Sequence, residues 1–448
     1  MSLTRIGLLV LATAATAVLP ACQGPPADLI HRPDYPQRII LTWDGDPAQT
    51  QAVTWHTGAY EGKAFAEIAA ADASPNFRHY ARRVEAQTET VPEEPDSGFF
   101  HSVTFTGLEP DTLYAYRVGD GETWSAWHQF RTAADEARPF SFIYVGDAQN
   151  AILSLWSRTI REAYSDLPEA RFIVHAGDLV NRPNSRREWA EWFESAGWVN
   201  AMIPSVAAPG NHEYYDVGKG EDKTRRLSHF WRPHFTFPEH GPEGFEESVY
   251  YIDFQGLRII SLDSSVKDVR EVGPEAHVEW LEDVLRDNPN RWTIVTLHHP
   301  FYATHPSRDN GRLREAWQPL FDKYGVDMVL QGHDHAYGRG HNLPVGQRAR
   351  DEAGTVYVVS VSGPKMYDVG YDKHDWLDRA AENTQLYQTI RIDGDKLAYR
   401  ATTVTGELYD AFDLVKEDGR TRLVERMPPA AGVRTRENTL PDPEAPND

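Results

Sequence analysis

The pattern of apolar and polar positions changes near residue 135, and this change divides the chain into two predicted domains. Between residues 38 and 132 the apolar residues fall into short runs with alternating, β-branched or aromatic content, and turn residues separate the runs. Such spacing is typical of an all-β sandwich, in which each strand buries one face. The runs cover residues 39–43, 52–56, 66–70, 100–105, 113–118 and 128–131.

A mixed α/β pattern follows the linker at residues 133–137. A strand at 140–145 precedes apolar residues at helical spacing between 152 and 163, and a second strand begins at Phe172. Strand, helix and strand form a βαβ unit, whose parallel strands end at the same edge of a sheet. We therefore expect Asp147 and Asp178, which follow the two strands, to be neighbours in space.

Three later apolar runs also end in a turn and then in polar residues. The runs and their polar residues are 203–207 with Asn211 and His212, 292–297 with His298, and 328–330 with His333 and His335. Between them, residues 216–247 combine polar and aromatic residues with scattered Gly and Pro, which predicts a long loop. Two runs that flank Gln255-Gly256 predict an antiparallel hairpin. From residue 416 to 448 the charged, Pro-rich composition predicts a mostly disordered tail.

Composition supports two domains and excludes one class of partner. A chain of 448 residues is too long for one ordinary domain, and 40% hydrophobic residues with 13 Trp supply enough material for two cores. The formal net charge is −22. Overall charge therefore does not favour binding of nucleic acid. A small anionic substrate would need local positive charge, which a bound metal ion supplies.

The N-terminus resembles an export signal. Arg5 precedes an apolar segment at residues 6–19 that is too short for a comfortable membrane span, and Leu19-Pro20-Ala21-Cys22 resembles the cleavage box of bacterial lipoproteins. We expect residues 1–22 to be a signal peptide, Cys22 to be lipidated and residues 23–37 to be a tether. This places the protein in the periplasm or at the outer membrane, with the lipid as its membrane attachment. The alternative is an ordinary signal peptide with an incidental Cys.

The polar residues at the five strand ends have the chemistry of a metal site. Carboxylate, amide and imidazole ligands suit zinc, manganese or iron, and a thiolate site is excluded because the chain has one Cys. One carboxylate can bridge two divalent ions ~3.5–4 Å apart, and such a pair activates water and neutralises charge on a phosphoryl group. The pattern predicts metal-assisted hydrolysis, with Asp178 as the candidate bridge.

Five sequence blocks in this order resemble the calcineurin-like metallophosphoesterases. They are Gly146-Asp147, Gly177-Asp178, Gly210-Asn211-His212-Glu213, Val295-Thr296-Leu297-His298 and Gly332-His333-Asp334-His335. Residues 108–118 resemble the fibronectin type III signature, which implies that Tyr114 ties a corner of the sandwich to nearby backbone. With this fibronectin-like domain in front, the chain is most similar to purple acid phosphatases and their bacterial relatives. The resemblance implies a fibronectin III-like all-β domain at 38–132 and an α/β (α+β) metallophosphoesterase domain at 138–415, a β-sandwich flanked by helices.

The resemblance also implies a role for each residue of the blocks. Asp178 would bridge the two metals; Asp147 and His335 would complete one site, and Asn211, His298 and His333 the other. The nucleophile would be a hydroxide held by the metals. His212 would sit beside the substrate phosphate, as an electrostatic helper or as the proton donor to the leaving group.

Two positions depart from the family pattern. Gln149 stands where the wider family has His, and Asn181 stands where purple acid phosphatases have the Tyr that gives their colour. Both amides could ligate the first metal or only hydrogen-bond beside it, because amides serve in both ways. Loss of the Tyr predicts a protein without the iron-tyrosinate absorption band.

The residues that select the substrate are less sharply marked. His299 could contact substrate, with a structural His-Pro turn as the alternative. His305 and Arg308 lie on the loop after His298, where the family places substrate-side groups, with a solvated loop as the alternative. The function expected is hydrolysis of a small-molecule phosphate monoester. The alternatives are a phosphodiesterase acting on nucleotides or phospholipid headgroups, and a binding lipoprotein with an inactive metal site.

Overall fold

The computed structural model describes most of the chain after the N-terminal segment. The described residues are 33–60, 62–218, 223–268, 273–342, 353–371, 375–427 and 432–440. The predicted signal peptide and Cys22, and most of the expected tether, lie outside these residues. Within the described part, no helix combines the length and the apolar character that a membrane span requires.

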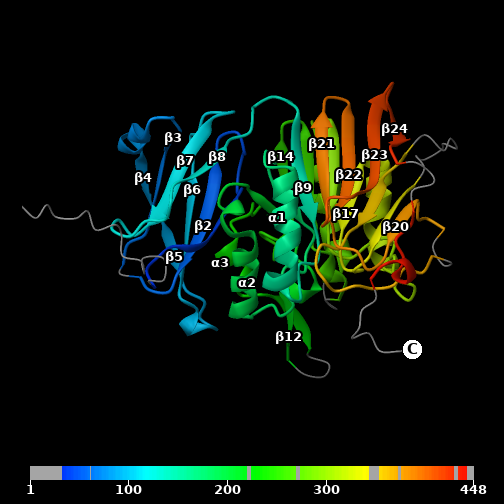
Figure 1. Cartoon of the computed structure of the whole chain (residues 1–448), viewed down its shortest axis with the longest axis horizontal. Coiled ribbons are helices and arrows are strands. Elements are labelled where there is room, and N and C mark those ends of the chain that lie inside the picture. The colour runs from blue at the N-terminus through cyan, green and yellow to red at the C-terminus, as the bar shows by residue number, and fades with distance from the viewer. Residues whose placement is uncertain are drawn as a thin grey trace, which may run out of the picture.

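An all-β sandwich forms the N-terminal domain, drawn in blue and cyan in Figure 1. In the described residues its sheets have the strand orders β1-β2-β6-β5 and β4-β3-β7-β8. The strands are β1 (Gln37–Thr42), β2 (Gln51–Thr57), β6 (Phe99–Phe105) and β5 (Gln87–Glu89) in one sheet, and β4 (Arg82–Glu85), β3 (Phe65–Ala70), β7 (Leu113–Gly119) and β8 (His128–Arg131) in the other. The Tyr114 hydroxyl accepts a hydrogen bond from the Glu109 amide at 2.9 Å, which makes the corner expected at this position.

The second domain stacks two mixed sheets. The order β11-β10-β9-β21-β22-β23-β24 forms the first sheet, and β14-β15-β16-β17-β19-β18-β20 forms the second. The first contains β9 (Phe140–Val145), β10 (Ile173–His175), β11 (Ser205–Ala207), β21 (Leu386–Asp393), β22 (Lys396–Thr403), β23 (Leu408–Glu417) and β24 (Arg420–Glu425). The second contains β14 (Tyr250–Phe254), β15 (Leu257–Ser261), β16 (Trp292–Thr296), β17 (Met328–Gln331), β18 (Tyr337–His341), β19 (Val356–Val359) and β20 (Arg379–Ala381).

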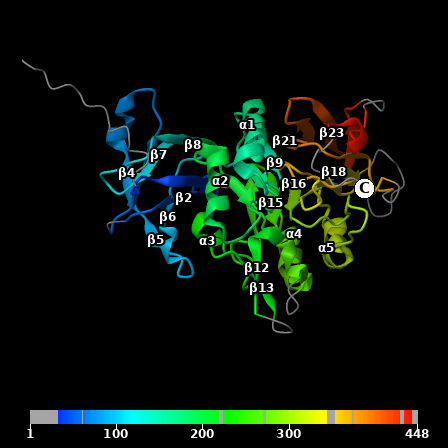
Figure 2. The same cartoon turned by 60° about the horizontal axis from the view of Figure 1, so that its bottom comes forward.

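Helices cover the outer faces of the stacked sheets (Figures 1 and 2). They are α1 (Ser157–Asp166), α2 (Arg186–Ala196), α4 (Val278–Arg286) and α5 (Gly311–Tyr324). The short α3 (Trp231–His234) instead contacts β2 and β6 of the N-terminal domain. A core between the two sheets includes Phe142, Val174 and Leu330, and a second core beneath α4 and α5 includes Leu281 and Trp317. The expected architecture, a β-sandwich flanked by helices, is confirmed.

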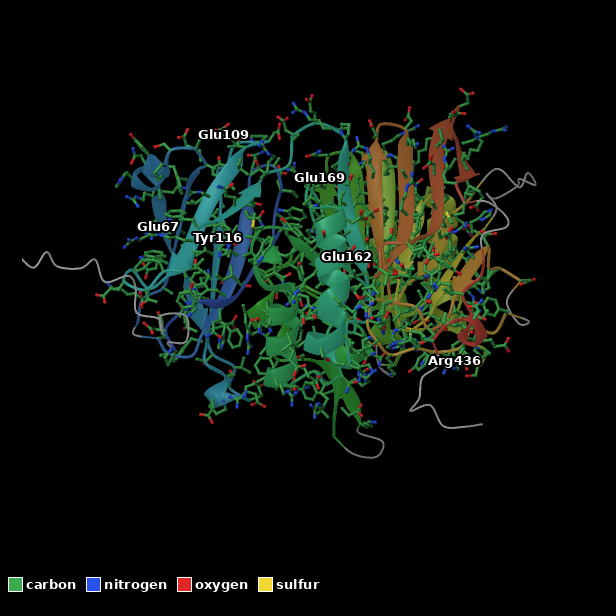
Figure 3. All side chains as sticks on the ribbon, viewed as in Figure 1. Glu67, Glu109, Tyr116, Glu162, Glu169 and Arg436 are labelled. Carbon is green, nitrogen blue, oxygen red and sulfur yellow. The ribbon has the colours of Figure 1, made fainter. Side chains whose placement is uncertain are left out.

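The two domains share a core at their junction. Trp43 of the N-terminal domain packs on Phe172 and Phe254, with ring centroids 5.8 and 5.5 Å apart. Tyr116, labelled in Figure 3, donates its hydroxyl to the carbonyl of Ala201 at 2.6 Å across the junction. Because apolar packing and buried hydrogen bonds both cross this boundary, the N-terminal domain holds a fixed place beside the second domain.

The end of the chain differs from its expected disorder. β24 (Arg420–Glu425) pairs with β23 in antiparallel register, and Arg434 forms a parallel bridge to Ala381. The ordered sheet therefore extends beyond residue 415. Residues 216–247 also differ from a plain loop: β12 (Tyr214–Val217) and β13 (Thr224–Leu227) pair as a hairpin, and α3 follows. Both differences arise because polar, solvent-facing strands carry no clear hydrophobic pattern.

Buried histidines of the N-terminal domain predict a loss of stability in acid. Burial, with the charge of Arg38, lowers the pKa of His56 to about 4, and burial, with His56, lowers the pKa of His101 to about 4. The unfolded chain therefore binds these protons more readily, so the free energy of unfolding should fall as pH drops from about 6.5 to 4, by up to about 3 kcal/mol per histidine. In thermal unfolding between pH 7 and 4.5, His56→Gln should flatten this fall, whereas the exposed control His79→Gln should leave it unchanged. An identical pH profile for both variants would contradict the assignment.

Candidate metal centre

The polar residues predicted at five strand ends meet between the two sheets. In the first sheet β10 lies parallel to both β9 and β11, so the loops that carry Asp147, Asp178 and Asn211 leave from one edge. In the second sheet β16 and β17 are parallel, and their loops carry His298 and His333. The βαβ prediction that Asp147 and Asp178 are neighbours is confirmed, because both belong to one group of candidate metal ligands.

Several of these residues adopt a left-handed backbone. The φ angles are +53° at Asp147, +52° at Asp178, +73° at His333 and +32° at His335. Non-glycine residues rarely adopt such angles, and the strain is tolerated where the surrounding structure fixes the site. Gly210 allows the close approach, because a Cβ at this position would lie 2.2 Å from Asp178 Oδ1.

Two groups of ligand atoms form at this point and share one carboxylate. Asp147, Asp178 and His335 form the first group, and Asp178, His298 and His333 form the second. Within each group the ligand atoms lie within 4.8 Å of one another. Asp178 is the member common to both, which is the geometry required of a bridging carboxylate.

Backbone carbonyls fix the orientation of two of the histidines. His298 Nδ1 lies 2.8 Å from the Ala176 carbonyl, and His335 Nδ1 lies 3.0 Å from the Lys365 carbonyl. A carbonyl can only accept, so both Nδ1 atoms carry a proton and both Nε2 atoms face the centre. This arrangement is common among metal-ligating histidines.

Burial of two carboxylates makes the centre attractive to cations. Asp147 and Asp178 have exposures of 0% and 1%. Burial raises the pKa of Asp147 well above its ordinary range, and the charge of Asp178 adds to this effect. Burial acts in the same direction on Asp178, but the charge and hydrogen bond of His298 outweigh it and hold its pKa well below the ordinary value. Two adjacent buried carboxylates are costly unless positive charge compensates them, so the donor set fits two metal ions.

The amide residues occupy different places around this centre. Gln149 Nε2 lies 2.9 Å from Asp178 Oδ2 and 3.0 Å from His335 Nε2, and its buried Oε1 has no hydrogen-bond partner among the described residues. Asn211 Oδ1 lies 3.1 Å from His298 Nε2. Asn181 makes its hydrogen bonds through the backbone, donating to Glu188 and accepting from His212.

His212 and Glu213 support the centre from one side. His212 Nδ1 donates to the Asn181 carbonyl at 2.6 Å, and the His212 amide donates to Asp178 Oδ1 at 2.9 Å. The carboxylate of Glu213, fully buried, accepts backbone N–H groups from two strand-end loops. The donors are Gly210 at 2.7 Å, Asp178 at 2.9 Å, Leu179 at 2.8 Å and Val180 at 3.3 Å. Glu213 thus fixes the loop of Asp178 to the loop of Asn211.

The residues expected on the substrate side separate into two environments. His299 is 1% exposed; its Nδ1 lies 3.0 Å from Ser264 Oγ, and its ring packs 4.3 Å from that of His333. Arg308 donates to the His333 carbonyl at 2.9 Å and pairs with Asp334 at 2.8 Å. Asp334 also accepts the amide of His305 at 3.1 Å. Asp334 therefore fixes the loop of His305 and Arg308 beside the metal-ligand block.

Two residues that lie near the centre were not predicted from the sequence. The ring of Tyr367 lies 4.8 Å from that of His335 and 5.5 Å from that of His305, and the guanidinium of Arg308 lies 5.0 Å from the Tyr367 centroid. Lys365, whose carbonyl holds His335, has its Nζ 5.2 Å from the same ring. Both residues follow β19. The expectation that polar residues after buried strands gather at one site would therefore have indicated them as well.

Two family models match consecutive parts of the chain. The purple acid phosphatase N-terminal domain matches residues 36–132, and the calcineurin-like phosphoesterase model matches residues 140–337. A solved purple acid phosphatase from seeds of yellow lupin (Lupinus luteus) has a TM-score of 0.71 with 18% sequence identity, and the match covers 86% of this chain and 75% of that one. This likeness shows a common fold.

Curated relatives are similar over part of their length. An uncharacterized protein of Mycobacterium tuberculosis is 28% identical over 270 residues, which are 53% of this chain and 50% of that protein. The Fe(3+)-Zn(2+) purple acid phosphatase 12 of Arabidopsis thaliana is 25% identical over 329 residues, which are 69% of this chain and 66% of that protein. The chain spans about half the length of the first curated relatives that it matches.

Proposed function

Because the chain belongs to the calcineurin-like phosphoesterases and carries the N-terminal domain of purple acid phosphatases, we propose that it hydrolyses phosphate monoesters with two bound metal ions. One observation carries the proposal. Asp178 is a member of both groups of ligand atoms, so a single buried carboxylate is available to two cations at once. A protein that only binds a partner has no chemical need for such an arrangement.

The two ions and the residues around them would have separate tasks. Bound metal ions activate water and neutralise the charge that develops on the phosphoryl group. Asp147, Gln149, Asp178 and His335 would hold one ion, and Asp178, Asn211, His298 and His333 the other. The unpartnered buried Oε1 of Gln149 supports its assignment, since a turn of the amide would direct this oxygen to the cation between Asp178 and His335. Iron, zinc and manganese all suit this set.

His212 would act on the leaving group. Its Nδ1 proton is committed to the Asn181 carbonyl, so Nε2 is the ring atom available to hold or deliver a proton. Asn181 would contribute by positioning this ring through its carbonyl. The Tyr367 ring, His305 and Arg308 form a half-buried wall beside His335, where a substrate's organic group would rest.

Metal content and two aryl substrates test the proposal. Mass spectrometry of the purified chain should find about two metal ions per chain. Turnover of 4-nitrophenyl phosphate should exceed that of bis(4-nitrophenyl) phosphate. A preference for the second compound would indicate a phosphodiesterase. Absence of metal, together with absence of turnover after iron, zinc or manganese is supplied, would contradict the hydrolase and favour a binding protein.

Replacing His212 with Asn should separate proton donation from metal binding. We expect kcat to fall by about 10²- to 10⁴-fold, the usual contribution of a general acid. The loss should be larger for an alkyl phosphate than for 4-nitrophenyl phosphate, because nitrophenolate leaves without protonation. Metal content should remain that of the wild type. Equal losses on both substrates would assign His212 a purely electrostatic or structural role.

We also propose that the protein is exported and attached to a membrane through a lipid on Cys22. The apolar segment at residues 6–19 and the small residue before Cys22 support this. Cys22→Ser should release the protein from the membrane fraction of its host. Release of the wild type itself would indicate an ordinary signal peptide.

A further inference from the structure

A cavity of about 710 Å³ lies at the junction of the two domains, and none of the candidate metal ligands lines it. Residues 35–39, Ser125, Ala126 and His128 line it on the N-terminal side, and the second domain contributes α2, the turn after it and Leu153. Figures 1 and 2 show α2 beside the N-terminal strands. Small-molecule sites usually have volumes of about 300–1,000 Å³ and favour such domain junctions.

Much of the cavity wall is apolar. Ile39, Phe193 and Ala201 line it, together with Leu153 and Trp198. Trp198 is 54% exposed and Leu153 is 42% exposed. Large apolar side chains that remain open to water around a cavity are surface that an apolar ligand would cover favourably.

One cation at this cavity has no anionic partner. Arg38 contacts the His234 ring at 3.3 Å and donates to the Arg186 carbonyl at 3.4 Å, and no described carboxylate lies within ion-pair distance of it. Burial and the nearby charge of Arg186 lower its pKa to about 10. By contrast, Arg187 at the same cavity pairs with Glu191 at 2.7 Å. A ligand anion would therefore find an uncompensated charge at Arg38.

The cavity runs beside α2, and its two ends differ in charge. Arg186 is the first residue of α2, so Arg38 lies at the N-terminal end of the helix, where the peptide dipoles favour negative charge. Phe193 and Trp198 lie at the other end, and the exposed carboxylate of Glu194 there disfavours a second anionic group. The cavity thus suits one anionic head and one apolar body.

We propose that this junction cavity binds an amphipathic monoanion, a medium- or long-chain carboxylate, with the carboxylate at Arg38 and the chain along Phe193, Ala201 and Trp198. The ligand would contact both domains at once. Binding would therefore stabilise the junction in proportion to RT ln(1 + [L]/Kd), with no change at the metal centre.

Decanoate below its micelle concentration tests the proposal on the full-length, metal-loaded protein. Calorimetric titration should give one saturable site, and decanoate should raise the thermal midpoint. Arg38→Gln should weaken binding by at least about tenfold, the loss expected for one charge-assisted pair. Ala190→Trp, which fills the cavity from α2, should abolish it. The matched control Arg82→Gln, an exposed arginine of the same domain that donates to the Thr106 carbonyl, should bind as the wild type does.

Three outcomes would overturn the proposal. The first is no saturable binding of decanoate. The second is binding that neither Arg38→Gln nor Ala190→Trp alters. The third is decanol binding as tightly as decanoate, which would remove the role of the anionic head. Turnover of 4-nitrophenyl phosphate by Arg38→Gln serves as the check of folding and should equal that of the wild type.

Discussion

Replacing Asp178 with Ala should abolish both metal retention and hydrolysis. Asp178 is 1% exposed and belongs to both groups of ligand atoms, so its loss removes a ligand from each ion. Metal ions supply several kcal/mol of transition-state stabilisation, and about 4 kcal/mol corresponds to a loss of about 10³-fold in kcat/KM. Metal content by mass spectrometry should fall from about two ions per chain to less than one.

The buried Asp413 offers a matched control for this substitution. Its side chain is also 1% exposed, and it pairs with Lys396 and Arg426 on β22 and beyond β24, away from the ligand groups. Asp413→Asn should lower the thermal midpoint yet keep the metal ions and the activity. If Asp178→Ala retained two ions and near-normal turnover, the bridging assignment would be wrong.

Replacing Glu213 with Ala should cause the largest loss of stability among single substitutions near the site. The carboxylate accepts four buried backbone N–H groups, and its removal leaves them without partners. Each unsatisfied buried group costs about 1–3 kcal/mol, and partial refilling by water reduces the sum, so we expect about 3–5 kcal/mol. The measurement is the free energy of unfolding by denaturant of the metal-loaded protein.

The same variant should also bind metal more weakly. Glu213 fixes the loop of Asp178, and loss of such support typically lowers metal affinity by 10- to 100-fold. Glu67→Gln is the control: this carboxylate, labelled in Figure 3, pairs with Arg83 and Arg117 in the N-terminal domain. It should lose stability while its metal affinity stays unchanged. Equal metal affinity in Glu213→Ala and the wild type would show that the loop holds its shape without this carboxylate.

Several elements could be predicted because their sequence pattern and their environment agree. The strand predicted at residues 140–145 is β9 in the structure, and the hairpin predicted around Gln255-Gly256 is β14 and β15. These strands are buried, so hydrophobic runs mark them clearly. β4 (Arg82–Glu85) and β5 (Gln87–Glu89) escaped prediction because they are edge strands with mostly exposed polar residues.

The sequence by itself determined the two fold classes and the residue types of the metal centre. Buried parallel strands carry long apolar runs, and the turns that end them at one sheet edge must hold the polar residues, so order along the chain is enough to indicate the site. The order of the residues along the chain could not show which of them belongs to both ligand groups.

Only the tertiary structure decided which atoms meet. It put Asp178 in both ligand groups, turned the Nε2 atoms of His298 and His335 inward and brought Lys365 and Tyr367 beside them. It also placed Arg38 at a cavity between the domains, where no carboxylate of the described residues pairs with it. The physical reason is that such contacts join segments far apart in sequence. Their distances depend on how two sheets and two domains pack, and no local pattern encodes that packing.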